Sequence, residues 1–263
     1  MQRIQKILSN YGFCSRRKAE ELIKERKVKV NDRIASIGDK ASENDKIYVD
    51  RKLVREQKKV YLMINKPVAC VTALKDGYFK TVMDYVRIKE RVFPVGRLDC
   101  NTSGLLLLTN DGDFANKITH PRYEIEKIYF VEIDRPIAEK EIRLIEKGIN
   151  LKDGRTSPAK IKRFKKNQLE IAIHEGRNRI VRRIFKKLNF KVKALHRVSI
   201  GKLSIGDLKP GKYRFLLKKD REEIFKRKKD ALTFNRTSRL SKNGASTAIT
   251  ENGKGYHRRK KIA

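Results

Sequence analysis

Two short helices are predicted at the start of the chain. Apolar residues recur at helical spacing from Ile4 to Leu8, and Gly12 interrupts the pattern. Ser15 can then cap a second helix, whose first turn displays Arg16, Arg17 and Lys18. Free backbone amides and basic side chains at a helix N-terminus suit phosphate, so these three residues are candidates for RNA binding.

Short strands are predicted after these helices, over 28–32 and 46–50, because apolar and polar residues alternate there. A small N-terminal domain over residues 1–58 is therefore expected. The polar and charged residues 51–59 are typical of a linker.

A larger domain is predicted over residues 59–229. It opens with the apolar run 60–65. Further strands are predicted near 105–109, 127–134, 168–174 and 190–200, and helices near 113–119, 138–147, 178–189 and 220–229. Strands outnumber helices and do not alternate with them regularly, so we expect an α+β fold with a mixed, largely antiparallel sheet and flanking helices.

The last segment, residues 230–263, holds few large apolar side chains and ends in a basic run, Arg258-Arg259-Lys260-Lys261. It cannot bury enough apolar surface to fold alone, so a disordered basic tail is predicted.

Charge points to a polyanionic partner. The chain of 263 residues carries 66 Lys+Arg against 31 Asp+Glu, a net charge of +35. The excess is spread along the chain, since residues 1–60 alone hold 17 basic and 9 acidic side chains. Nucleic acid is the partner that this balance favours, with lysine-rich genome composition as the alternative explanation.

Cysteine usage and hydropathy indicate a cytoplasmic protein with no membrane partner. Cys14, Cys70 and Cys100 match neither a disulfide framework nor a zinc site. The longest apolar runs, such as 105–108, are too short to span a bilayer. The basic first nineteen residues could be a targeting segment, but the N-terminal domain accounts for them better.

The segment most suggestive of chemistry is Phe93-Pro94-Val95-Gly96-Arg97-Leu98-Asp99-Cys100-Asn101-Thr102-Ser103-Gly104, which precedes a four-leucine strand. A carboxylate on a loop held by a buried strand is a common mounting for a reactive group. Spacing alone slightly favours a plainer role, in which the Asp99 carboxylate caps the turn that follows it.

This segment, extended through Leu105-Leu106-Leu107-Leu108-Thr109-Asn110-Asp111-Gly112, resembles the signature of the RsuA-type (RsuA/RluB-like) ribosomal RNA pseudouridine synthases. The resemblance continues through His120–Tyr129, Glu175–Arg183 and Arg197–Leu203, and the first sixty residues resemble the alpha-L RNA-binding domain that this branch carries. It implies isomerisation of a specific uridine in ribosomal RNA, with the large subunit favoured and the small subunit as the alternative. The chain is expected to be monomeric. No cofactor or metal is expected, because nothing is oxidised and nothing leaves.

The family resemblance assigns the nucleophile to Asp99, its cationic partner to Arg182 and the stacking residue to Tyr129. A carboxylate covered by RNA needs a nearby cation to stay ionised. Helical periodicity leaves Arg182 and Arg183 equally placed, and only alignment with the family motif chooses Arg182.

The remaining basic residues of the motif, Arg177, Arg179 and Arg183, are expected to meet phosphates or solvent. Arg97 is a candidate to hold the flipped nucleotide, with a structural ion pair as the alternative. Two other functions stay open: a non-catalytic RNA-binding assembly factor, and a glycoside hydrolase, for which a second carboxylate is missing from the Asp99 loop.

Overall fold

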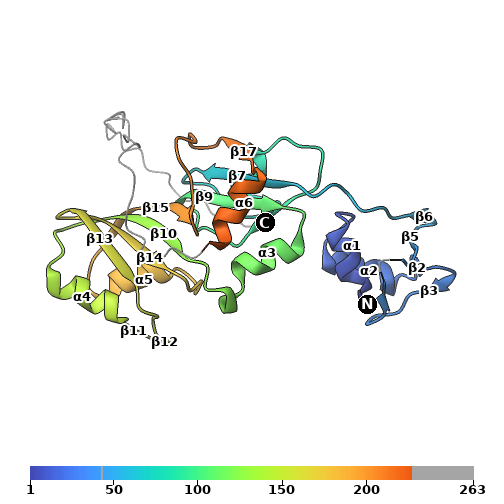
Figure 1. Ribbon diagram of the computed structural model, residues 1–263, viewed down its shortest axis with the longest axis horizontal. Helices are drawn as coiled ribbons and strands as arrows, with labels where there is room; N and C mark the ends of the chain where they lie inside the picture. The colour runs from blue at the N-terminus through green and yellow to red at the C-terminus, as the bar shows by residue number, and fades with distance from the viewer. Residues whose placement is uncertain (43, 227–263) are drawn as a thin grey trace, which may run out of the picture. The chain divides into compact units, whose positions relative to one another are not determined.

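The computed structural model of the protein describes residues 1–42 and 44–226 (Figure 1). The basic tail predicted over 230–263 and the last residues of the predicted larger domain lie outside the described residues.

The N-terminal domain contains the two predicted helices and the predicted strands. Its elements are β1 (Gln2–Arg3), α1 (Ile4–Asn10), α2 (Arg16–Lys24), β2 (Val28–Val30), β3 (Arg33–Ile34), β4 (Lys40–Ala41), β5 (Ile47–Val49) and β6 (Lys52–Leu53). The Ser15 hydroxyl accepts a hydrogen bond of 3.1 Å from the Lys18 amide, so Ser15 caps α2 as expected. Side chains from both helices and from β2 and β5 form one apolar core.

The prediction that residues 51–59 form a linker is wrong for the first residues of that range. Residues Lys52–Leu53 form β6, which pairs antiparallel with β5, and Val54 is buried. The polar composition of this segment concealed a short edge strand, because an edge strand exposes most of its side chains to water.

The larger domain is built on one mixed sheet. Within the described residues its main strands run in the order β13-β14-β10-β15-β9-β7-β17, with β8 paired to β9 and β16 paired to β15. The strand bounds are β7 (Tyr61–Lys66), β8 (Phe93–Val95), β9 (Ser103–Thr109), β10 (Lys127–Ile133), β13 (Lys160–Lys165), β14 (Gln168–Ile173), β15 (Val192–Ile200), β16 (Leu203–Ser204) and β17 (Tyr213–Phe215), with a separate hairpin of β11 (Asn150–Leu151) and β12 (Gly154–Arg155). The α+β class and the largely antiparallel sheet are therefore confirmed.

A short parallel pairing joins the two halves of this sheet. Strands β15 and β9 pair only through His196 with Ser103 and Arg197 with Gly104, and we call these four residues the seam. A Cβ atom on Gly104 would lie 2.3 Å from the carbonyl oxygen of Arg197, and Gly104 also has φ of 111°. Only glycine permits so close a backbone approach in this conformation.

Helices pack on both faces of the sheet, because successive side chains of a strand point to opposite faces. In β9 the run Leu105–Leu108 is buried on both faces: Leu105 and Leu107 pack with α3 (Gly112–Thr119) and α6 (Lys218–Phe225), whereas Leu106 and Leu108 pack with η1 (Val82–Tyr85). On the other half of the sheet, α4 (Glu139–Lys147) and α5 (Ile180–Lys187) close a separate core. A further 3-10 turn, η2 (Pro121–Tyr123), precedes β10.

Helix α5 is shorter than the predicted helix over 178–189. Its N-cap, Arg179, has a left-handed backbone with φ of 50°, so the helix can begin only at Ile180. At the other end Phe190 folds back, with its amide donating to the Phe185 carbonyl over 2.9 Å, and β15 therefore starts at Val192 rather than 190.

Candidate active site

Asp99 lies on the loop between β8 and β9. The Asp99 backbone carbonyl, rather than its carboxylate, accepts from the Thr102 amide over 3.0 Å and closes the turn. The carboxylate lines a pocket, and its side chain is 28% exposed. The turn-capping alternative for the Asp99 side chain is therefore not what the structure has.

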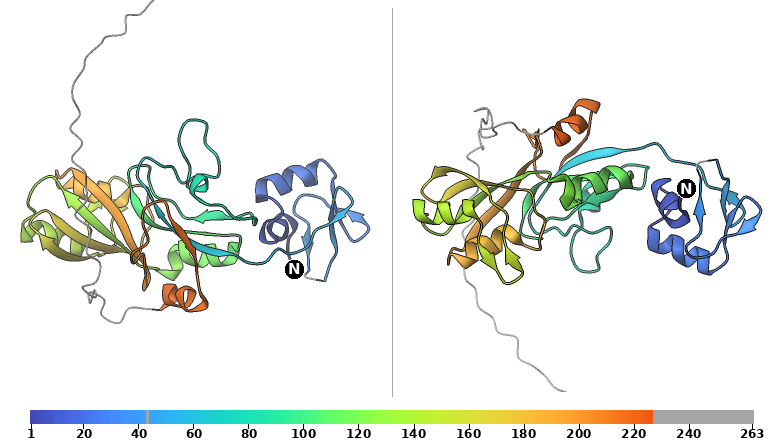
Figure 2. Two further views of the ribbon diagram at one scale, coloured as in Figure 1. Left: turned by 90° about the horizontal axis from the view of Figure 1, so that it is seen from above. Right: turned by 60° about the horizontal axis from the view of Figure 1, so that its bottom comes forward.

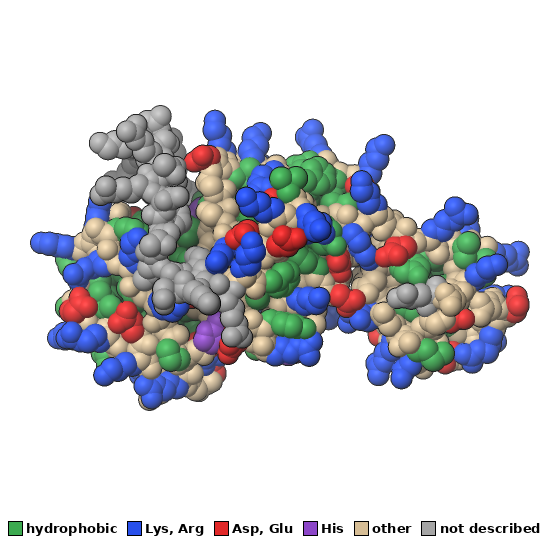
Figure 3. Space-filling view, viewed as in Figure 1, with side chains coloured by type: hydrophobic (Ala, Val, Ile, Leu, Met, Phe, Trp, Pro, Cys, Tyr) green, Lys and Arg blue, Asp and Glu red, His purple; other side chains and the backbone are tan. Residues whose placement is uncertain are grey.

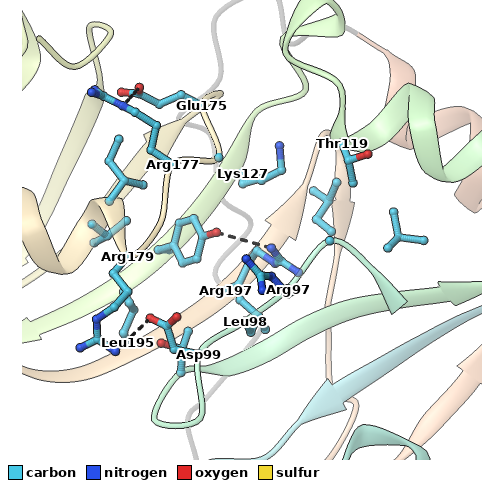
Figure 4. Close-up of a pocket in the computed structure, with 18 of the residues that line it drawn as sticks. Arg97, Leu98, Asp99, Thr119, Lys127, Glu175, Arg177, Arg179, Leu195 and Arg197 are labelled. Carbon is cyan, nitrogen blue, oxygen red and sulfur yellow. Dashed lines mark hydrogen bonds and ion pairs between the residues drawn. The ribbon is translucent and has the colours of Figure 1, made fainter. Parts of the chain in front are cut away.

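Two arginines from the start of α5 face Asp99. The distances to Asp99 Oδ2 are 3.7 Å from Arg179 Nη1 and 4.0 Å from Arg182 Nε (Figure 4 draws the Arg179 contact). The sequence prediction placed Arg182 here and sent Arg179 to phosphate, so the second, nearer cation was missed. The left-handed backbone of Arg179 brings it to the carboxylate, and periodicity could not indicate this.

Arg182 is the better anchored of the two. Its Nη2 donates to the Asn101 carbonyl over 2.6 Å and to Thr102 Oγ1 over 3.4 Å, both on the loop that carries Asp99. Burial lowers the pKa of Arg182, the charge of Arg179 lowers it further, and Asp99 acts in the opposite direction. Arg182 therefore fixes the loop as well as placing positive charge beside the carboxylate.

Arg177 and Arg183, expected at phosphates or in solvent, are both held within the protein. Arg177 Nε lies 2.8 Å from Glu175 Oε2, and Arg183 pairs with Asp153. The Arg183 guanidinium is the main cause that lowers the pKa of Asp153 to about 2. Arg177 Nη1 also lies 3.2 Å from Asp153 Oδ1, so Arg177 and Arg183 together fasten the start of α5 and the segment before it to the β11–β12 hairpin. Sequence spacing did not indicate this structural role.

Tyr129 lines the same pocket from β10, opposite Arg197 of β15. Arg197 Nη1 donates to the Tyr129 hydroxyl over 3.4 Å, and its Nε donates to the Leu105 carbonyl across the seam over 2.7 Å. Arg197 is 3% exposed. Sequence reasoning gave Arg197 no role, although an arginine among the apolar residues of a buried strand was a usable signal.

Lys127 was also missed. It lines the pocket two residues before Tyr129, and its Nζ donates to the Ile125 carbonyl over 2.9 Å. Burial, with a smaller effect of the Arg197 charge, lowers the pKa of Lys127 to about 8.

Arg97 is exposed and lines the pocket from the Asp99 loop. Within residues 1–42 and 44–226 no carboxylate lies within ion-pair distance of Arg97, so the structural alternative for this residue is not supported. In the N-terminal domain Arg16 and Arg17 are exposed on the first turn of α2, whereas Lys18 pairs with Glu21 over 3.0 Å.

A buried lysine holds the Asp99 loop from beneath. Lys66, at the end of β7, is fully buried, and its Nζ donates to the carbonyls of Pro67, Cys100 and Thr102 over 2.9, 3.2 and 2.9 Å. Burial lowers the pKa of Lys66. Three carbonyl acceptors compensate the ammonium group for the water it loses.

The pocket has a volume of about 170 Å³. Cavities of about 150 Å³ hold a six-membered aromatic ring, so one pyrimidine base fits. The pocket offers that base an aromatic face, a carboxylate and several cations.

The described part of the chain contains no group of three or more His, Cys, Asp or Glu side chains that could hold a metal ion. None of its helices combines the length and the apolar character needed to cross a bilayer. Lysine and arginine side chains are spread over the face drawn in Figure 3.

Comparison with known proteins agrees with this geometry. Residues 60–187 match the family of RNA pseudouridylate synthases, and residues 2–58 match the S4 domain. The chain is 44% identical over 225 residues to ribosomal large subunit pseudouridine synthase B of Bacillus subtilis, covering 82% of this chain and 92% of that protein. It is 34% identical to the dual-specificity RNA pseudouridine synthase RluF of Escherichia coli, covering 85% of this chain and 78% of that protein.

A solved structure described as a pseudouridylate synthase superposes with a TM-score of 0.65 at 32% identity, over 85% of this chain and 100% of the other. An RNA pseudouridine synthase of Aquifex aeolicus is 45% identical over 234 residues, 85% of this chain and 94% of its own. The resemblance read from the sequence is thus confirmed, and the chain belongs to the RNA pseudouridine synthase family, with an S4 domain at its N-terminus.

Proposed function

We propose that this protein converts a specific uridine of large-subunit ribosomal RNA to pseudouridine, with Asp99 as the nucleophile. The observation that carries the proposal is the meeting of Asp99 and Tyr129 in one base-sized pocket, with Arg182 within ion-pair distance of the Asp99 carboxylate. The name of the relative from Bacillus subtilis, a ribosomal large subunit pseudouridine synthase, supports ribosomal RNA as the substrate class.

The proposed chemistry needs one ionised carboxylate. Attack by Asp99 on the base or on the ribose carbon allows the bond from ribose to ring nitrogen to break, the uracil to turn, and a bond from ribose to carbon five to form. The bond to Asp99 is then broken, the carbon-five proton leaves and ring nitrogen one takes up a proton from water, so atoms balance without a co-reactant. Arg179 and Arg182 keep the carboxylate charged when RNA excludes water from the pocket.

Tyr129 supplies the face on which the extracted uracil stacks, and its hydroxyl is the candidate acceptor of the carbon-five proton. Arg97, exposed at the mouth of the pocket, is proposed to hold the displaced nucleotide's phosphate or to fill the place that the base vacates. The RNA is proposed to be bound by a monomer in the cytoplasm, through an N-terminal domain over 1–58, a catalytic domain over 59–229 and a basic tail over 230–263.

The test is tritium release. Transcripts of 23S and 16S ribosomal RNA labelled with tritium at uracil carbon five are incubated with the full chain. We expect release to water from the 23S transcript, and a loss of at least about a thousandfold in rate for Asp99→Asn. Asp207→Asn is the matched control, because Asp207 is exposed and does not line the pocket.

The contrary outcomes are distinct. Unimpaired turnover by Asp99→Asn would refute the nucleophile, and release from the 16S transcript alone would change the substrate. The assembly-factor alternative would be favoured if the protein bound both transcripts tightly but released no tritium. The same result would be required with ribosomal precursor particles. Mapping pseudouridines in cells that lack the gene would then identify the position modified.

A further inference from the structure

A second surface with RNA-binding character lies on the loop over residues 72–80, which we call the aromatic loop. It belongs to the segment between β7 and β8, and Figure 2 (left) shows that segment projecting from the sheet. The base of the loop is closed by two backbone hydrogen bonds, 2.9 Å from the Val71 amide to the Lys80 carbonyl and 3.0 Å from the Val82 amide to the Val71 carbonyl. The two ends of the loop are therefore held together where it leaves the sheet.

The tip of the loop is ordered by its own hydrogen bonds. The Asp76 carboxylate accepts from the amides of Tyr78 and Phe79, each over 2.9 Å. These two bonds lower the pKa of Asp76, so the arrangement persists at neutral pH.

This ordered tip holds two aromatic rings in water. Tyr78 is 96% exposed and Phe79 is 57% exposed. Lys75 and Lys80 flank them, and both are exposed. Aromatic faces combined with flanking cations are the pattern that binds unpaired bases and their phosphates, because every base can stack and every nucleotide carries a negative charge.

The root of the loop is fastened to the loop that carries Asp99. The Thr72 hydroxyl donates to the Leu98 carbonyl over 2.8 Å and accepts from the Leu98 amide over 3.2 Å. Leu98 directly precedes Asp99, so the first residue of the aromatic loop, Thr72, contacts the neighbour of the candidate nucleophile. The root of the aromatic loop is therefore attached directly to the segment that positions Asp99.

We propose that the aromatic loop stacks Tyr78 and Phe79 on unpaired bases that neighbour the target uridine, with Lys75 and Lys80 on the adjacent phosphates. The inference rests on the proposed function and adds a recognition element to it. Extraction of one uridine breaks stacking with its neighbours, and the exposed rings replace part of that lost stacking. The loop thus favours sites where the neighbouring bases are unpaired.

The first test uses the absence of tryptophan from this chain. Tyr78→Trp introduces a single indole at the tip, and Phe164→Trp is the matched control, because Phe164 is also an exposed aromatic beside a lysine, on strand β13. On titration with the 23S transcript we expect strong quenching of the Tyr78→Trp fluorescence and little change in the control. Equal responses in the two variants would overturn the proposal, as would quenching that needs ribosomal proteins.

The second test is kinetic. Removing both rings with Tyr78→Ala and Phe79→Ala should raise KM for tritium release by roughly tenfold for each ring, with kcat nearly unchanged. The salt dependence of binding should stay the same in that double variant, whereas Lys75→Gln with Lys80→Gln should flatten the slope of log Kd against log salt by about 0.7 for each lysine. Wild-type KM in the double aromatic variant would refute the proposal.

Failure of the proposed function looks different. In that case the wild-type chain releases no tritium from either transcript, and the fluorescence titration still decides whether the loop meets RNA. Both rings lie at an exposed tip, so thermal unfolding of each variant should match the wild type and exclude misfolding as the cause.

Discussion

The Arg182 guanidinium bridges Asp99 and the backbone of the Asp99 loop, with Nε 4.0 Å from Asp99 Oδ2 and Nη2 2.6 Å from the Asn101 carbonyl. The Arg182 side chain therefore places a positive charge beside the Asp99 carboxylate and also holds the backbone of the loop that carries it. Arg179 lies nearer to the carboxylate at 3.7 Å, but its side chain is 53% exposed.

This difference in anchoring predicts different mutational effects. Arg182→Lys cannot reproduce the forked contacts, so we expect kcat for tritium release to fall by about a hundredfold. Arg179→Lys keeps an exposed charge near Asp99 and should cost less than about tenfold, mostly in KM. A larger loss for Arg179→Lys than for Arg182→Lys would contradict this assignment.

Tyr129 allows its ring and its hydroxyl to be tested separately. Tyr129→Phe keeps the stacking face and removes the group that Arg197 contacts over 3.4 Å. If the hydroxyl accepts the carbon-five proton, kcat should fall by about a hundredfold or more while RNA affinity stays constant. Tyr129→Ala should weaken binding as well. Wild-type kcat in Tyr129→Phe would leave the ring with the stacking role alone.

Lys66 is expected to matter without touching substrate. Lys66→Met leaves the carbonyls of Pro67, Cys100 and Thr102 without this donor, which should cost about 1–3 kcal/mol in the free energy of unfolding. Because two of these carbonyls belong to the Asp99 loop, kcat should also fall, more than KM rises. Lys193→Met, at an exposed position of β15, is the control and should change neither urea unfolding nor turnover.

The lowered pKa of Lys127 should make the free energy of unfolding depend on pH. Its pKa is about 8 in the folded protein and 10.5 ordinarily, so between these values the unfolded chain holds a proton that the folded chain has released. The free energy of unfolding contributed by this group should therefore rise with pH across that window, by at most about 3 kcal/mol. Lys127→Met should lack this rise, and urea titrations of both proteins at pH 7.5 and 9.5 measure the difference. Parallel pH profiles would show that the amine keeps its ordinary pKa.

The fold was largely predictable because its strands are strongly patterned. The leucines of β9 and the apolar arc of α5 predicted elements and core together, and both are buried. The catalytic role of the Asp99 loop was predictable only from its resemblance to a family, since spacing alone slightly favoured turn capping.

What the sequence could not predict depends on tertiary contacts between distant residues. Arg197 reaches Leu105 and Tyr129 only because β15 pairs with both β9 and β10. The engagement of Arg183 by Asp153 joins residues thirty positions apart on different elements. No local pattern distinguishes an arginine that will find such a partner from one that will face solvent.

The seam places the two sides of the candidate site on different halves of the sheet. Asp99 enters through β9, whereas Tyr129, Arg182 and Arg197 belong to the half that begins with β15, and Gly104 alone allows the backbones to meet. The pocket consequently comes into existence only when both halves have docked. In a partly unfolded molecule, in which each half of the sheet stayed folded but the two halves were apart, Asp99 would lie far from Arg182. Such a molecule could not modify RNA. The active site is therefore complete only when folding is complete.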